Sequence, residues 1–332
     1  MNLIKLVTFL LWFVLIVYII LGGTALGMAT WELFPPKEQG AQYRLFIHKA
    51  IGPTWEASHL LLIYLPFGLF LAYPFVYSVL STVFLVPAIL ILVAIVLRVI
   101  ALILLSINAM LSRLLRLVSL LALFLLGTIA GVIASGQIIF QQDQLVPVNL
   151  WNSYVIPFAV VMGAFVVALC SLQACLYLLV RAEEAENDTL IAALRSRSLI
   201  AVAVTTILAL VGLILARADV PILWHGMIKQ GIFLLVVTTF FWLWMVWSLF
   251  QEAYHRARNL MIIETALLLL WWGASQTPYL IPPHITIDYA TVGPYNVLIA
   301  LLIGSIIGLV CLFLAIRYHS HIFKSRGSEP SM

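Results

Sequence analysis

Residues 6–21 read LVTFLLWFVLIVYIIL, sixteen consecutive positions without a charged side chain. This run approaches the length of about 20 residues that an α-helix needs to cross the hydrocarbon core of a bilayer. Similar apolar runs recur along the rest of the chain. We therefore expect an all-α, polytopic integral membrane protein. The first run is expected to be a retained span, since no small-residue cleavage site leads from it into a polar domain.

The composition supports a membrane protein. Of the 332 residues, 64% are hydrophobic and 9% are charged, and the mean hydropathy is +1.14. A soluble domain has about 45–50% apolar and about 25% charged residues. These values exclude a large soluble catalytic domain, a nucleic-acid-binding module and a disulfide scaffold. Cys170, Cys175 and Cys311 lie in apolar runs without metal-ligand spacing, and we interpret them as small packing residues.

Windows of about 20 apolar residues predict nine membrane-spanning helices in a single domain over residues 1–332. They are Leu3–Met28, Ser58–Val79, Val83–Ser106, Leu114–Phe140, Tyr154–Val180, Ser198–Ala216, Gly231–Phe250, Leu260–Tyr279 and Tyr295–Ile316. The second and third helices must then be joined by a tight turn at residues 78–82. The longest connection, Ala29–Ala57, contains helix-breaking proline and glycine residues and leaves room for a short interfacial helix.

The positions of lysine and arginine predict the orientation, because cytoplasmic connections are enriched in both. Three of the 17 basic residues, Lys5, Arg217 and Lys229, lie at the N-terminus or in even-numbered connections, and the other 14 lie in odd-numbered connections or the tail. We expect the N-terminus outside and the C-terminal tail, residues 318–332, in the cytoplasm. The asymmetry also favours an odd number of spans.

Glu56 and His59 are candidate functional residues at the start of the second predicted span. Ionisable groups at membrane depth are costly, so each one suggests a function. Residues three apart share a helix face, and a carboxylate beside an imidazole can take up and pass on protons. The alternative is structural: Glu56 is favoured by the dipole at the helix N-terminus, and His59 reaches towards the interface. Both interpretations stay open from these residues alone.

Other polar residues within spans also have ordinary interpretations. Glu264 lies about one turn into the eighth predicted span and can reach back to pair with Arg258. Arg98, within or at the edge of the third span, can mark the cytoplasmic boundary. Ser171 and Gln173 in the fifth span are expected to hydrogen-bond between helices.

The most specific stretches are IGPTWE at residues 51–56 and FLAYPFVY at residues 70–77. With the same spacing between them, they resemble subunit II of the cytochrome bd quinol oxidases. In that family the connection from helix 1 to helix 2 ends in I-G/A-P-x-W-D, and helix 2 ends in F-A-A-F/W-P-x-V-Y. Arg98 falls at the first Arg of the family's R-G-x-x-F-E-F/Y-R segment. Residues 278–287, PYLIPPHITI, resemble the end of the family's helix 8.

The chain also departs from the family pattern. Helix 1 of the family ends in D-G-F-D-x-G, whereas residues 22–27 read GGTALG, which keeps glycines and lacks both acids. The family's Asp after the Trp is Glu56 here, and its E-F-R triplet is replaced by ILL at residues 103–105. The chain is therefore similar to a divergent member.

The resemblance implies a haem-free, non-catalytic subunit of a bd-type quinol:oxygen oxidase in a bacterial or archaeal cytoplasmic membrane. It implies a subunit I-like partner that carries haem b and haem d, and Glu56 as a proton-conducting carboxylate packed beside Trp55. We take Glu56 and His59 as the predicted proton pathway, with Trp55, Arg98 and Glu264 in support. Small single-helix subunits and membrane lipids are further expected partners. Binding of a structural quinone or lipid stays open.

Two other functions remain open from the sequence. One is a degenerate scaffold subunit of a divergent haem-containing membrane complex, and the other is a secondary transporter. The chain lacks paired Gly/Pro-broken helices in corresponding halves, which are the usual sign of a transporter site at the membrane midplane. We expect no nucleic-acid partner.

Overall fold

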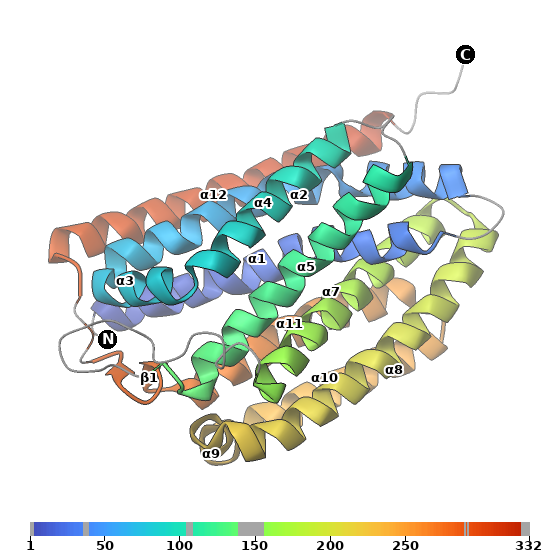
Figure 1. Cartoon of the computed structure of the whole chain (residues 1–332). Helices are drawn as coiled ribbons and strands as arrows, with labels where there is room; N and C mark the ends of the chain where they lie inside the picture. The colour runs from blue at the N-terminus through green and yellow to red at the C-terminus, as the bar shows by residue number, and fades with distance from the viewer. Residues whose placement is uncertain are drawn as a thin grey trace.

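The computed structural model is a bundle of long α-helices that lie side by side (Figure 1). It describes residues 3–35, 40–103, 109–138, 156–288, 290 and 292–326. The elements are α1 (Leu3–Leu33), α2 (Gly40–Ala72), α3 (Pro74–Val83), α4 (Leu85–Ile103), α5 (Ala109–Ser135), α7 (Pro157–Glu184), α8 (Asp188–Asp219), α9 (Pro221–Lys229), α10 (Ile232–Phe250), α11 (Tyr254–Gln276), β1 (Tyr279–Ile281), β2 (Ile285–Thr286) and α12 (Tyr295–Arg326). The two short strands form an antiparallel pair.

The helices confirm the polytopic, all-helical membrane class. Within the described residues, α1, α5, α7, α8, α10 and α12 are each long and apolar enough to cross a membrane. A seventh span results if α3 and α4, which are bent by 82° at their junction, are counted together. Helices α2 and α11 run alongside the others (Figure 1), and within α2 the described residues Ser58–Ala72 form a shorter apolar segment.

Prolines set the start of three helices. Pro74, Pro157 and Pro221 occupy the first turns of α3, α7 and α9. Proline fits this position because it has no N–H to leave unpaired, and it disfavours helical geometry in the residue before it. Tyr73 accordingly has φ −137° and ψ 72°, which ends α2 at Ala72.

The predicted boundary between the second and third spans is wrong for this reason. The second span does not continue to Val79, and the turn expected at residues 78–82 lies inside α3. Helix α3 is a separate short helix, bent sharply relative to α4. It buries the side chains of Val76, Val79 and Val83. At the break, the hydroxyl groups of Tyr73 and Thr8 are hydrogen-bonded at 2.6 Å, which fixes the start of α3 to α1.

The predicted connection Ala29–Ala57 is also wrong in extent. Helix α1 continues to Leu33, and α2 is helical from Gly40 through Gly52-Pro53. Proline is tolerated inside membrane helices where neighbouring helices pack against them, and α2 packs against α1 and α12. The hydroxyl groups of Tyr64 in α2 and Ser305 in α12 are hydrogen-bonded. Phe140 and Tyr154, which bound two predicted spans, lie outside the described residues.

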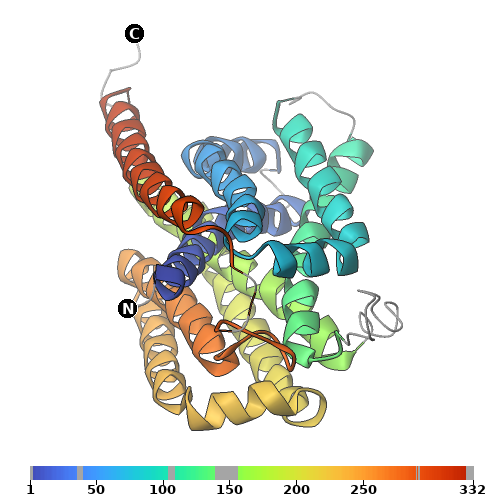
Figure 2. The ribbon, with the colours of Figure 1, turned by 90° about the vertical axis from the view of Figure 1, so that its left-hand side faces the viewer.

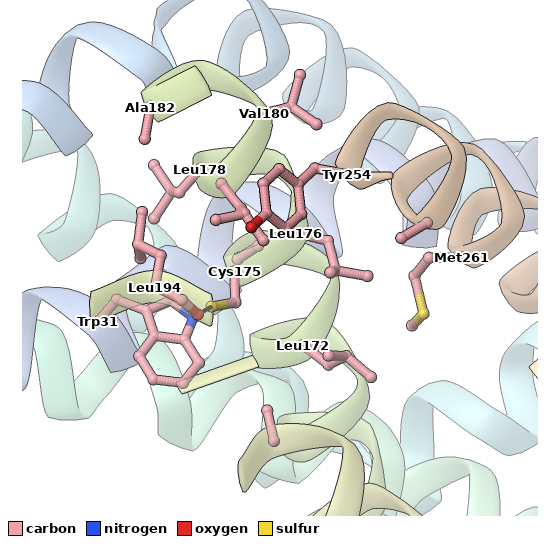
Figure 3. Packing of buried hydrophobic residues seen from close by; sticks show 14 of the residues in the cluster. Trp31, Leu172, Cys175, Leu176, Leu178, Val180, Ala182, Leu194, Tyr254 and Met261 are labelled. Carbon is pink, nitrogen blue, oxygen red and sulfur yellow. Dashed lines mark hydrogen bonds between the residues drawn. The ribbon is translucent and has the colours of Figure 1, made fainter. Parts of the chain in front are cut away.

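Helix α7 lies at the centre of the bundle and contacts α1, α5, α8 and α11. One hydrophobic core surrounds its second half and includes Leu172, Leu176 and Met261 (Figure 3). In the same core the thiol of Cys175 donates to the carbonyl of Leu194 at 3.4 Å (Figure 3). A second core lies at the other end of the bundle, where α9 runs across the helix ends (Figure 2).

Close contact between α1 and α7 depends on glycine. A Cβ atom at Gly27 would lie 2.2 Å from the backbone oxygen of Cys170, and one at Gly23 would lie 2.8 Å from the Cys170 sulfur. One turn further along, the hydroxyl groups of Thr30 and Ser171 are hydrogen-bonded at 2.6 Å, and Trp31 Nε1 donates to the Ser171 carbonyl at 2.8 Å. Small residues allow membrane helices to approach in this way.

We expect Gly27→Ala to lower the free energy of unfolding by about 1–3 kcal/mol, because the added methyl group meets backbone atoms that cannot move aside. Thermal unfolding in mild detergent measures the change. Gly304→Ala is the matched control, because a Cβ atom there has no neighbour within 4 Å. Equal melting temperatures for the two variants would contradict the proposed close packing.

Candidate functional site: a buried glutamate among arginines

The carboxylate of Glu32, in the last turn of α1, lies against the guanidinium group of Arg98 in α4. Arg98 NH1 donates to Glu32 Oε2 at 3.0 Å, and NH2 donates to Oε1 at 2.5 Å. The Glu32 side chain is 14% exposed and the Arg98 side chain is 2% exposed. Two parallel bonds between a guanidinium and a carboxylate form a strong and directional contact. The pair therefore fixes the end of α1 against α4.

Arg116 of α5 joins the same cluster. Its NH1 group donates to the backbone carbonyl of Glu32 at 2.7 Å. Carbonyls in the last turn of a helix lack partners within the helix and carry partial negative charge, so a cation is favourable there. One residue of α1 thus holds an arginine from each of two other helices.

The cluster carries more positive than negative charge. Arg44 and Arg113 lie close enough to repel Arg116, and Glu32 is the carboxylate that offsets this repulsion. Arg98 Nε is buried without an acceptor among the described residues. Such a site favours an anion, or the ionised form of an acid, over a cation.

A small cavity lies beside this cluster, between α1, α2 and α4. His59 and Ser58 of α2 line it together with Tyr18 and Gly22 of α1 and Ile95 of α4. Its volume of about 10 Å³ is at the lower limit for holding one water molecule. Ile95 is three residues before Arg98, so the cavity and the ion pair are about one helical turn apart. Glycine at position 22 leaves room for the Tyr18 ring, since a Cβ atom would lie 2.9 Å from it.

Of the predicted site residues, His59 and Arg98 lie in the same region. His59 lines the cavity together with Ile95, which is about one helical turn before Arg98. The backbone of Trp55 and Glu56 is helical and belongs to α2, but their side chains lie outside the described part of the structure. The prediction for their side chains therefore remains a prediction.

Glu264 is in a different part of the molecule, on α11, and it does not pair with Arg258 as expected. Arg258 donates to the neighbouring Asn259 at 3.1 Å, whereas Glu264 is 2% exposed. Its Oε2 atom is buried without a partner among the described residues. Glu264 points into the bundle because it shares the buried stripe of Leu260 and Met261, so it cannot reach back along the surface.

The interhelical role predicted for two polar residues of α7 holds for one of them. Ser171 bonds to Thr30 of α1. Gln173 is 4% exposed, but neither atom of its amide group has a partner among the described residues. The prediction for Gln173 is therefore wrong in this structure.

Glu32 is the important residue that the sequence reasoning missed. A first span that ends at Met28 leaves Glu32 in a connection. The sequence does contain a signal for the longer helix, since the Pro35-Pro36 pair is the first strong helix stop after the apolar run.

Among the described residues, no group of three or more His, Cys, Asp or Glu side chains is arranged to hold a metal ion. The described residues form a charged cluster and a small cavity near one end of a helical membrane bundle. This arrangement defines a polytopic membrane protein with a buried, arginine-rich site.

Comparison with known proteins identifies the family. Residues 3–323 match the family model described as cytochrome bd terminal oxidase subunit II. The chain belongs to this family. The bd oxidase from Geobacillus thermodenitrificans has a chain with the same fold, with a TM-score of 0.81 and 21% sequence identity over 97% of this chain and 99% of that one. The comparison with curated proteins found no match.

We expect Glu32→Gln to destabilise the folded chain by about 3–5 kcal/mol, because it leaves the buried guanidinium of Arg98 without its counter-ion. Unfolding of the purified protein, followed by heating or denaturant, measures the effect. Glu184→Gln is the control, because Glu184 forms an ion pair with Arg181 at 2.8 Å on the surface, where such pairs contribute about 0–1 kcal/mol. An equal decrease in the free energy of unfolding in both variants would show that the buried Glu32–Arg98 pair stabilises the fold no more than the exposed Glu184–Arg181 pair.

Proposed function

We propose that this chain is the haem-free accessory subunit of a bd-type quinol:oxygen oxidase, and that it supports assembly of a haem-bearing, subunit I-like partner. The single observation that carries the proposal is the family match over residues 3–323. The common fold over nearly the full length is consistent with it. In this proposal haem b and haem d belong to the partner, and the chain performs no chemistry by itself.

We also propose nine membrane crossings, with the N-terminus outside a bacterial or archaeal cytoplasmic membrane and the tail, residues 318–332, inside. The start of α1 and the end of α12 lie at opposite ends of the bundle (Figure 1), as an odd number of crossings requires. In this proposal α2 and α11 are the eighth and ninth crossings, in addition to the six single helices and the α3–α4 pair. Polar residues such as Lys49 and Glu264 lower the hydropathy of these two helices.

Large apolar side chains on the outside of the bundle suit contact with a partner or lipid. Examples are Leu60 and Ile63 on α2, which are 66% and 68% exposed, and Phe313 on α12, which is 61% exposed. Exposed surfaces of this kind mark membrane or protein contacts. The subunit I-like partner, any small single-helix subunits and membrane lipids are the proposed occupants.

Proton delivery is the second part of the proposal. Glu56 is the proposed proton-conducting carboxylate and Trp55 its packing neighbour. His59, half-buried beside the cavity, would pass the proton inwards through a bound water. The cluster of Arg98 and Glu32 lies next to this route and would stabilise negative charge along it.

A second candidate function is a scaffold that has lost any proton route. The observation that favours it is the GGTALG sequence at residues 22–27, which lacks both acids of the family's helix 1. In this chain Gly22 and Leu26 line the cavity without offering a carboxylate. Activity measurements on Glu56 variants separate the two functions.

The first test is affinity purification of the chain from its native membrane in mild detergent. The proposal predicts a larger co-purifying membrane subunit and a reduced-minus-oxidised spectrum with b- and d-type haem bands. A haem-free preparation that contains this chain alone would contradict it.

Glu56→Gln is expected to slow quinol-driven oxygen consumption of the intact complex by about 10²-fold or more, because a neutral amide cannot take up and release the proton. Glu56→Asp keeps the acid that the family pattern has after the Trp and is expected to retain most of the activity. The haem spectrum of each preparation controls for assembly. Full activity in the Gln variant with a normal spectrum would remove the proton route and favour the scaffold.

A further inference from the structure

A second cavity opens at the end of the bundle opposite the arginine cluster. It lies between α9 and the segment that follows α11, and residues 221–230 and 277–279 contribute most of its wall. Its volume is about 460 Å³, within the range of about 300–1,000 Å³ that is usual for ligand sites. The cavity does not touch any residue of the proposed proton route.

Helix α9 forms one wall because it is fixed tightly across the helix ends (Figure 2). A Cβ atom at Gly226 would lie 1.8 Å from the backbone oxygen of Ser275, so the two backbones are in direct contact. Leu223 and Met227 are buried beneath the helix. Its polar side is then turned away from the core and towards the surface of the bundle end.

The polar side of α9 presents His225 and Lys229 to the cavity. Residues four apart are neighbours on one helix face. Neither side chain forms an ion pair among the described residues, and no acidic side chain is among the described residues that line the cavity. Asp219, at the end of α8, accepts a hydrogen bond from the backbone of Phe158 instead. Among the described residues, the rim of the cavity therefore carries the Lys229 ammonium and the His225 imidazole without an acidic partner.

The remaining wall is largely apolar and leads onto an exposed apolar surface of α10. Ile222 and Pro278 contribute to it. Directly after α9, the exposed side chains of α10 begin with Ile232 (49% exposed), Phe233 (74%) and Val236 (63%). A ligand that suits this site has an anionic head and an apolar body.

We infer that this cavity binds the head group of an anionic phospholipid. The phosphate lies between Lys229 and His225, and the acyl chains extend along the exposed surface of α10. Basic pockets between membrane helices bind anionic lipid head groups, and each lysine near the membrane surface strengthens the attraction. In the proposed orientation this site faces the outer leaflet. The inference rests on α9, α10 and residues 277–279, and it is independent of the proposed oxidase function.

The test uses photoactivatable phosphatidylglycerol in nanodiscs that contain the full-length protein purified from its native membrane, with photoactivatable phosphatidylcholine as the zwitterionic comparison. Mass spectrometry quantifies the cross-links to peptides from residues 221–236 and 274–280. We expect phosphatidylglycerol to label these peptides about fivefold more than phosphatidylcholine, the preference that one lysine provides at a lipid surface.

Lys229→Gln should remove this preference, and His225→Gln should reduce it. Lys5→Gln is the matched control: Lys5 is an exposed lysine in α1 that pairs with Asp288 at 3.3 Å and is not in the cavity wall. A preference that survives in Lys229→Gln, or equal labelling by both lipids in the unaltered chain, would overturn the inference. Loss of the preference on addition of excess inorganic phosphate would assign the site to free phosphate and overturn the lipid assignment.

Discussion

The carboxylate of Glu32 is the interaction on which one end of this bundle depends. Arg98 and Arg116, both almost completely buried, donate hydrogen bonds to Glu32, and Arg44 and Arg113 add positive charge near Arg116. Removing such charges from water costs several kcal/mol per ion unless an opposite charge and hydrogen bonds compensate. Glu32 supplies both through its side chain and its backbone carbonyl, and so it holds α1, α4 and α5 together.

Helix α1 has a second structural role because it also packs against α7. Gly23 and Gly27 bring the two backbones close, and the Thr30–Ser171 bond follows one turn later. The family's acids in this part of helix 1 are replaced by small residues here, and the carboxylate is found at Glu32 instead. The proposed proton route would therefore use α2, through Glu56 and His59, beside a charge cluster that α1 and α4 build.

The sequence predicts the class of the fold well, since hydropathy is a property of each segment by itself. The run at residues 6–21 and the family motif at residues 51–56 needed no knowledge of neighbouring helices. Interactions between helices could not be predicted in the same way. The pairing of Glu32 with Arg98 and the isolation of Glu264 depend on which faces of distant segments meet. The break at Tyr73-Pro74 follows from proline, which disfavours helical geometry in the residue before it. The hydropathy stays high on both sides of this position, so a hydropathy window does not detect the break.

An electron cryo-microscopy structure of the complex purified from its native membrane tests the account most directly. It should show this chain beside a larger subunit that holds the haems, with the Glu32 carboxylate buried against the Arg98 guanidinium at the end of α1. An assembly made only of copies of this chain, or a Glu32 side chain directed into solvent with Arg98 paired elsewhere, would contradict the account.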